Sequence, residues 1–157
     1  MKVVVLFPTR MESAPFVKRV AQGECMEGVK VEICGVGMAE CGACLARIVM
    51  AEKPDVVVLA GVAGSYVPTL RLGDTVAVAE ECVADMGRVE SWTEIDGERF
   101  TPLFQKTYTA SLLPEGVASV RSNTVNGCGI PYINTLCAEI ENMEGAPPYT
   151  PRPWHEP

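Results

Sequence analysis

Short, unbroken apolar runs separated by helix-like segments constrain the fold of this chain most strongly. Val3–Phe7 and Val56–Leu59 contain no polar residue. Such runs are typical of parallel strands whose sheet is covered on both faces by crossover helices. We therefore predict an α/β layered fold. Its first elements are predicted as strands over 3–7, 29–34 and 56–60 and helices over 12–22 and 38–52.

The regular alternation of strand and helix ends after Gly61. Beyond it the sequence predicts strands over 75–80 and 119–125. A polar surface loop is predicted over 87–97, and a short helical stretch around 132–137.

Composition and charge narrow the class of protein. The chain has 157 residues, 48% of them hydrophobic, which predicts one well-filled domain rather than a disordered chain. Its 20 acidic and 13 basic residues give a net charge of -7, so nucleic acid is not expected as a partner. The apolar start is closed by Pro8 and is too short for a signal peptide or a membrane span. We therefore expect a cytoplasmic protein with no membrane partner.

The cysteines and the histidine point to no cofactor and no metal. Seven cysteines, an odd number, are scattered through apolar segments, which favours reduced, buried thiols over a disulfide framework. Cys41 and Cys44 form a C-x-x-C pair, but neither a second pair nor a nearby histidine completes a zinc site, and the single His155 is close to the C-terminus. Helix packing is the favoured interpretation of the pair, with a redox or metal role as the alternative.

Glycine-rich turns could present backbone amides to a ligand. The turn 35–40 begins like a dinucleotide fingerprint, yet Glu40 stands where the third glycine belongs, so crowding and charge oppose a pyrophosphate there. Gly61–Ser65 directly follows an apolar strand, where ligands of α/β sheets gather. Its small residues let a ligand approach the backbone, or they serve a tight strand exit for steric reasons alone.

The sequence ENMEGA at 141–146 is a paired-carboxylate motif that follows a strand-like run. A carboxylate such as Glu144 can accept hydrogen bonds from two neighbouring ribose hydroxyls, and a thioether such as Met143 can lie against the carbon face of the sugar. The alternative is a helix N-terminus, with Glu141 and Glu144 near the positive end of the helix dipole.

These motifs together resemble the nucleoside phosphorylase and nucleosidase superfamily. The likeness rests on the order, spacing and content of LAGVAGS at 59–65, LRLGDTV at 70–76 and ENMEGA at 141–146. Within the superfamily the chain is most similar to futalosine hydrolase, through EECVADMG at 80–87, SNTVN at 122–126 and the methionine-glutamate-glycine-alanine ending. The resemblance covers residues 2–146.

The resemblance implies a mixed central sheet flanked by helices, in the three-layer arrangement of nucleoside phosphorylases. It also implies a homo-oligomer that acts on a small-molecule nucleoside without a cofactor. Met143 and Glu144 would contact the ribose, Ala63 and Gly64 would line the sugar and base pocket, and Glu12 would position the attacking water. A carboxylate just after the first strand can accept a proton from water and stabilise a ribosyl oxocarbenium ion. Without the resemblance, Glu12 is more simply a solvated residue in the first turn of a helix.

Hydrolysis and phosphorolysis differ in whether water or an anion is bound beside the anomeric carbon. Relatives that use phosphate bring arginines and a hydroxyl to that position, whereas here the turn has Val62 and the strand before it has no arginine. Arg10 is the nearest candidate in sequence, and Arg71 is expected on an exposed hairpin. We therefore predict hydrolysis of an N-ribosidic bond, as in futalosine hydrolase and hence in menaquinone precursor formation. The alternatives are a methylthioadenosine or S-adenosylhomocysteine nucleosidase, a nucleoside phosphorylase and a non-catalytic nucleoside-binding remnant.

The superfamily has a further strand beyond the methionine-glutamate motif, whose aspartate or asparagine serves the leaving base. The resemblance therefore implies a C-terminally truncated domain over 1–146, with the leaving-group acid outside this chain and activity impaired. The proline-rich residues 147–157 cannot continue a helix from Gly145 and are predicted to be a non-homologous tail.

Overall fold

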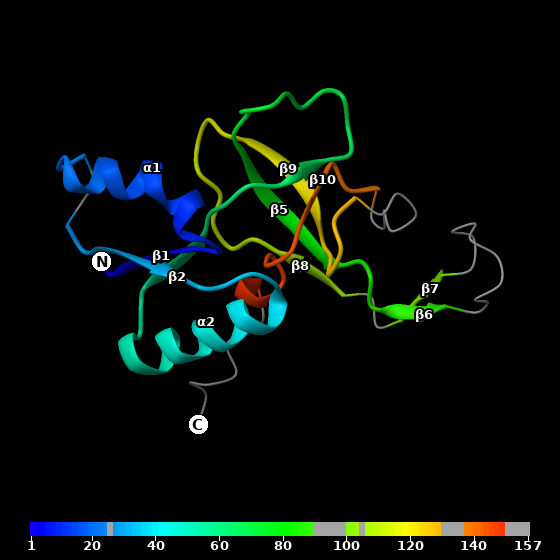
Figure 1. Cartoon of the computed structure of the whole chain (residues 1–157), viewed down its shortest axis with the longest axis horizontal. Helices are drawn as coiled ribbons and strands as arrows, with labels where there is room; N and C mark the ends of the chain where they lie inside the picture. The colour runs from blue at the N-terminus through cyan, green and yellow to red at the C-terminus, as the bar shows by residue number, and fades with distance from the viewer. Residues whose placement is uncertain (25–26, 90–99, 104–105, 130–136, 150–157) are drawn as a thin grey trace. The chain divides into compact units, whose positions relative to one another are not determined.

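The computed structural model describes residues 1–24, 27–89, 100–103, 106–129 and 137–149. The chain divides into two compact units, Met1–Val62 and Ala63–Pro157 (Figure 1). In the described part of the chain, no helix is long and apolar enough to cross a membrane.

The first unit is a three-stranded parallel sheet with a helix in each crossover. Its elements are β1 (Val3–Phe7), α1 (Arg10–Ala21), β2 (Val29–Ile33), α2 (Met38–Glu52) and β3 (Val56–Leu59). The strand order is β2-β1-β3, and β1 is parallel to both neighbours. The predicted strands and helices of this unit are confirmed, with ends that shift by at most two residues.

The ends of the two helices follow local sequence signals. Thr9 has an extended backbone and caps α1 by accepting a hydrogen bond from the backbone N–H of Glu12. α2 begins after Gly37 and ends at Glu52, because the next residue, Lys53, has a left-handed φ of 47° and directly precedes Pro54.

β1 lies between two clusters of buried side chains, one on each face of the sheet. Leu6 belongs to a cluster with Cys41 and Ile48 of α2. Phe7 belongs to the other cluster, and its ring centroid lies 5.7 Å from that of Phe16 in α1. This strand is therefore covered on both faces, as its apolar sequence predicted. The position of Cys41 in the core agrees with helix packing as the role of the C-x-x-C pair.

β3 is covered less completely than predicted. Val58 is 42% exposed, although it belongs to an unbroken apolar run. The strand lies at the edge of its sheet and pairs there with β1 alone among the described strands. A side chain at such an edge has fewer neighbours than one on a central strand, so an apolar run does not by itself ensure burial on both faces.

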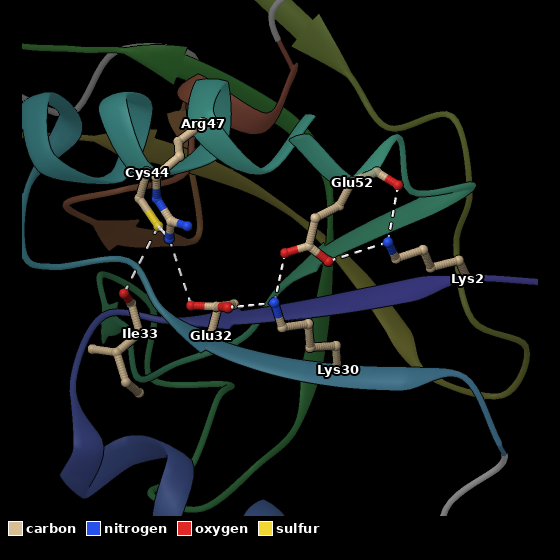
Figure 2. A network of polar contacts seen from close by, with 7 residues as sticks. All are labelled: Lys2, Lys30, Glu32, Ile33, Cys44, Arg47 and Glu52. Atoms are coloured by element: carbon tan, nitrogen blue, oxygen red, sulfur yellow. Dashed lines mark hydrogen bonds and ion pairs between the residues drawn. The ribbon is translucent and has the colours of Figure 1, made fainter. Parts of the chain in front are cut away.

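A chain of charged side chains joins β2 to the C-terminal end of α2 (Figure 2). Nζ of Lys30 lies 2.8 Å from Glu32 and 2.5 Å from Glu52, and Lys2 lies 3.2 Å from Glu52. The hydrogen bonds to Glu32 and Glu52 raise the pKa of Lys30, and the bond from Lys30 lowers the pKa of Glu52. Exposed ion pairs contribute little to stability because water and salt screen them. The apolar core is therefore expected to dominate the stability of this unit.

The second unit contains a mixed sheet of five strands and a separate two-stranded ribbon. Its elements are β4 (Gly64–Ser65), β5 (Val76–Val83), β6 (Gly87–Val89), β7 (Phe100–Pro102), β8 (Thr107–Thr109), β9 (Ala118–Thr124), β10 (Ile140–Asn142) and the 3-10 helix Pro147–Tyr149. The order in the larger sheet is β4-β10-β9-β5-β8, and β6 pairs with β7. β5, β9 and β10 are parallel, whereas β4 and β8 are antiparallel to their neighbours. The fold is mixed α/β, as predicted.

The sequence predicted this second unit less accurately. The strand expected over 119–125 is confirmed as β9, and the one expected over 75–80 is confirmed as β5 but continues to Val83. The loop prediction over 87–97 is wrong at its start, because Gly87–Val89 pairs with β7, and residues 90–97 lie outside the described part. The expected helical stretch also lies outside the described residues, apart from Cys137, as do residues 150–157 of the tail.

Candidate functional site

Glu12 is held at the carboxyl end of the parallel sheet in the first unit. Its Oε2 accepts a hydrogen bond from the Thr9 hydroxyl at 2.6 Å, and its Oε1 accepts one from the backbone N–H of Val62 at 3.1 Å. Gly61, which follows β3, packs closely here, because a Cβ on it would lie 3.0 Å from Oε1 of Glu12 and 3.2 Å from Cδ of Pro8. The carboxylate is therefore fixed between the start of α1 and the exit of β3.

This arrangement leaves the Glu12 carboxylate able to bind water. The side chain is half-buried, and an ionised carboxylate has about four acceptor positions, of which the bonds from Thr9 and Val62 use two. Thr9 and Glu12 also form a variant of the capping box, since the Thr9 hydroxyl accepts the N–H of Glu12 and donates to its carboxylate. The residue thus has a structural role at the helix start and free acceptor capacity as well.

Ala63 and Gly64 follow this turn at the start of the second unit, and both are exposed. Gly64 belongs to β4 and pairs with Glu141 of β10. A Cβ on Gly64 would lie 3.1 Å from both Cγ and Oε1 of Glu141. Close packing against Glu141 therefore gives Gly64 a steric reason to be small.

Glu141, the first carboxylate of the paired motif, is buried and holds two other segments by hydrogen bonds. Its Oε2 accepts from the Tyr66 hydroxyl at 2.7 Å, and its Oε1 accepts from the backbone N–H of Gly129 at 2.7 Å. Burial, followed by the hydrogen bond to Glu141, raises the pKa of Tyr66 to about 12. Burial also raises the pKa of the Cys128 thiol, and the charges of Glu141 and Glu144 add to that effect.

The second half of the motif forms a bend rather than the helix N-terminus considered above. The motif begins inside β10, and residues 143–145 form a bend directly after that strand. Oδ1 of Asn142 accepts the backbone N–H of Glu144 at 2.9 Å and that of Gly145 at 2.5 Å. An asparagine that binds the backbone two and three residues ahead stabilises such a turn. The bend leaves Met143 half-buried and Glu144 7% exposed.

Glu81 is the residue of this region that the sequence prediction missed. It lies in β5 beside Ser122 of β9, is completely buried, and accepts a hydrogen bond from Nδ2 of Asn142 at 3.0 Å. Burial raises the pKa of Glu81, although the bond from Asn142 opposes the shift. The predicted strand stopped at residue 80, which left Glu81 outside the sheet. Extending it with the period of two would have placed Glu81 on one face with Val83.

Two of the three stretches that carry the likeness to futalosine hydrolase, 80–87 and 122–126, are neighbours in the structure. β5 pairs with β9 up to Val83↔Thr124. Beyond the ends of these strands, Asp85 accepts hydrogen bonds from both the backbone N–H and the side-chain amide of Asn126. In the part of the chain that the structure describes, no group of three or more histidine, cysteine, aspartate or glutamate side chains is placed to hold a metal ion.

We expect Gly145→Ala to displace the bend that carries Glu144. A Cβ on Gly145 would overlap Oε2 of Glu81 and lie 2.7 Å from Nδ2 of Asn142. Overpacking of this kind typically costs about 1–3 kcal/mol. Thermal unfolding should show the loss, and Glu81→Ala added to Gly145→Ala should reverse part of it by removing the obstructing carboxyl. Identical unfolding of Gly145→Ala and the unaltered chain would contradict the proposed contact.

The comparison with known protein families decides which family the chain belongs to. The profile described as "Phosphorylase superfamily" matches residues 10–147. The chain belongs to the phosphorylase superfamily. The matched span includes all of the candidate residues, namely Glu12, Ala63, Gly64, Met143 and Glu144. A search of curated proteins finds no match.

Solved structures show the same fold at low sequence identity. A methylthioadenosine/S-adenosylhomocysteine nucleosidase from Helicobacter pylori matches with a TM-score of 0.70 and 16% identity over 95% of this chain and 77% of its own. A futalosine hydrolase from the same organism matches with a TM-score of 0.68 and 16% identity over 94% and 76%. A nucleosidase of the first kind from Campylobacter jejuni gives 0.62 and 18% over 94% and 77%. The phosphorylase-superfamily fold predicted from the motifs is thereby confirmed.

Proposed function

We propose that this phosphorylase-superfamily chain hydrolyses the N-ribosidic bond of a nucleoside. The observation that carries the proposal is the Glu12 carboxylate, fixed by Thr9 and Val62 at the carboxyl end of a parallel sheet with acceptor capacity left for water. Membership of the superfamily supports the proposal, as do solved relatives of the same fold that are themselves nucleosidases.

Glu12 is the proposed base. It accepts a proton from the attacking water, and its negative charge stabilises the oxocarbenium character of the sugar as the bond to the base breaks. In the same proposal, Glu144 accepts hydrogen bonds from the ribose hydroxyls, and Met143 lies against the carbon face of the sugar. Ala63 and Gly64 line the sugar and base pocket.

Water is favoured over phosphate as the nucleophile. Phosphate is an anion, and an anion beside the Glu12 carboxylate needs cationic neighbours. Arg10 is exposed at the start of α1, and the side chain of Arg71 is 86% exposed and paired with Asp74 at 3.6 Å. The turn that carries Val62 and the strand before it contain no arginine, which favours water.

A futalosine-like nucleoside is the proposed substrate, because the stretches at 80–87 and 122–126 most resemble futalosine hydrolase. Methylthioadenosine or S-adenosylhomocysteine is the second candidate, since nucleosidases for these compounds are among the solved structures of the same fold. We further propose that residues 1–146 form one nucleosidase-like domain. In the same proposal, several copies of the chain assemble into a homo-oligomer, and no cofactor takes part.

Base release from futalosine and from methylthioadenosine, each with and without phosphate, tests this function. We expect release that does not depend on phosphate and that persists in Arg10→Ala, because that arginine has no role in activating water. Strictly phosphate-dependent release, lost in Arg10→Ala, would establish phosphorolysis instead. Nucleoside binding without base release, abolished by Glu144→Ala, would establish a binding protein and overturn hydrolysis.

A further inference from the structure

Asn142 connects the ends of the parallel strands to the bend at 143–145. Its Nδ2 donates to Oε2 of Glu81 at 3.0 Å and to Oγ of Ser122 at 2.7 Å. Its Oδ1 accepts the backbone N–H groups of Glu144 and Gly145. One end of the side-chain amide is therefore bound to β5 and β9, and the other end is bound to the bend.

We propose that Asn142 and Glu81 are positioning residues that set the bend carrying Glu144, and thereby the affinity of this chain for ribose hydroxyls. The proposal rests on the function proposed above, in which Glu144 binds those hydroxyls. It adds residues from β5 and β10 that act through the backbone of the bend and do not touch the nucleoside.

The register of the strands brings these groups together. β5 and β9 place Glu81 opposite Ser122, while β9 and β10 place Thr124 opposite Asn142. Thr124 holds the far end of the bend, because its Oγ1 accepts the backbone N–H of Ala146 at 2.9 Å. Side chains of β10 and β9, Asn142 and Thr124, therefore bind the backbone N–H groups of the bend and of the residue after it.

A buried glutamate at position 81 costs folding free energy that an apolar side chain there would not cost. The residue is completely buried, and hydrogen bonds from Asn142, Thr124, Ser122 and the backbone of Cys82 only oppose the rise in its pKa that burial causes. Burial of a carboxyl group is unfavourable, and an apolar side chain of similar size would avoid that cost. What an apolar side chain cannot do is accept the hydrogen bond from Nδ2 of Asn142, which fixes the orientation of the amide.

The close contact at Gly145 makes the bend sensitive to Glu81. A Cβ on Gly145 would overlap the carboxyl of Glu81, so the Gly145 backbone packs closely against this side chain. Loss of the carboxyl removes both the support under Gly145 and the hydrogen-bond partner of Asn142. Replacement by glutamine keeps the shape and an acceptor oxygen.

Nucleoside affinity tests the proposal with four variants: Glu144→Ala, Asn142→Ala, Glu81→Ala and Glu81→Gln. The probes are futalosine, methylthioadenosine and analogues of each that lack the ribose hydroxyls, and binding is measured by calorimetry. We expect Glu144→Ala to weaken binding about 100-fold through the loss of charged hydrogen bonds. Asn142→Ala and Glu81→Ala should each weaken it about tenfold, and Glu81→Gln should restore it to within about threefold.

The hydroxyl-free analogues separate positioning from general damage. Under the proposal, Asn142→Ala and Glu81→Ala do not weaken binding of these analogues further, because the bend then has no hydroxyl to bind. The proposal is overturned if Asn142→Ala and Glu81→Ala weaken the binding of both kinds of nucleoside equally. It is also overturned if these two variants bind nucleosides as the unaltered chain does while Glu144→Ala binds them more weakly. No binding of any nucleoside by the unaltered chain would contradict the proposed function instead.

Amide hydrogen exchange gives a readout that needs no nucleoside. The N–H groups of Glu144 and Gly145 should exchange about tenfold faster in Glu81→Ala than in Glu81→Gln, because their acceptor Asn142 is no longer oriented. The N–H of Val62, bonded to the Glu12 carboxylate in the first unit, is the internal control and should not change. Equal exchange at Glu144 and Gly145 in both variants would overturn the positioning role.

Discussion

Glu12→Gln is expected to slow base release by about 10² to 10⁴, the usual contribution of a general base. Glutamine has nearly the same shape and keeps an oxygen that can accept the N–H of Val62, but it cannot take a proton from water. Nucleoside affinity should therefore stay within about threefold of that of the unaltered chain. The rate of base release at saturating nucleoside and the affinity for the same nucleoside measure the two effects separately.

Glu40→Gln is the matched control for this experiment. It makes the same chemical change in the first turn of α2 that Glu12→Gln makes in the first turn of α1. Loss of a favourable charge near a helix N-terminus typically costs about 0.3–1 kcal/mol, so both variants should be slightly destabilised. If Glu12 is only part of a helix cap, Glu12→Gln will show this small loss of stability and release base at the unaltered rate.

The first unit was predictable because its signals are local. Val3–Phe7 and Met38–Glu52 have the ends that their sequences indicate, since Pro8 closes the first and Gly37 and Pro54 flank the second. The exposure of Val58 was not predictable from its own run, because burial depends on what pairs with or covers the edge of the sheet.

The second unit depends on contacts that are distant in sequence. β5 continues through Glu80 and Glu81 because both pair with β8 and β9, and two adjacent glutamates carry no strand signal of their own. Glu81 is buried and accepts a hydrogen bond from Asn142, which lies 61 positions away in the sequence. Strand propensity, which is judged from a short stretch of sequence, cannot detect a partner so far away.

The candidate site was predicted unevenly for the same reason. The motif at 141–146 contains two carboxylates, and the structure gives them different surroundings. Glu141 binds Tyr66, which is 75 positions away, and the backbone of Gly129. Glu144 lies instead in a bend whose backbone is held by Asn142. The assignment of Glu12, Ala63, Gly64, Met143 and Glu144 to substrate stays a prediction drawn from the resemblance.

Glu81→Gln is expected to stabilise the protein increasingly as the pH rises. Burial raises the pKa of Glu81 above its ordinary value of 4.5, so the folded chain holds a proton at pH values where the unfolded chain has lost it. The neutral carboxyl therefore contributes its full stability below pH 4.5, and that contribution is lost as the pH rises through the folded pKa. Glutamine cannot ionise and avoids this loss.

Unfolding in urea from pH 4 to pH 8 measures the effect as the difference in unfolding free energy between Glu81→Gln and the unaltered chain. Each unit of pKa shift corresponds to about 1.4 kcal/mol, so the difference should grow with pH in favour of glutamine and then level off above the folded pKa. Glu80→Gln is the matched control, because Glu80 is the preceding residue of β5 and is only half-buried. If the difference in unfolding free energy between Glu81→Gln and the unaltered chain stays constant with pH, the Glu81 carboxyl ionises normally in the folded protein. Folding would then not raise its pKa.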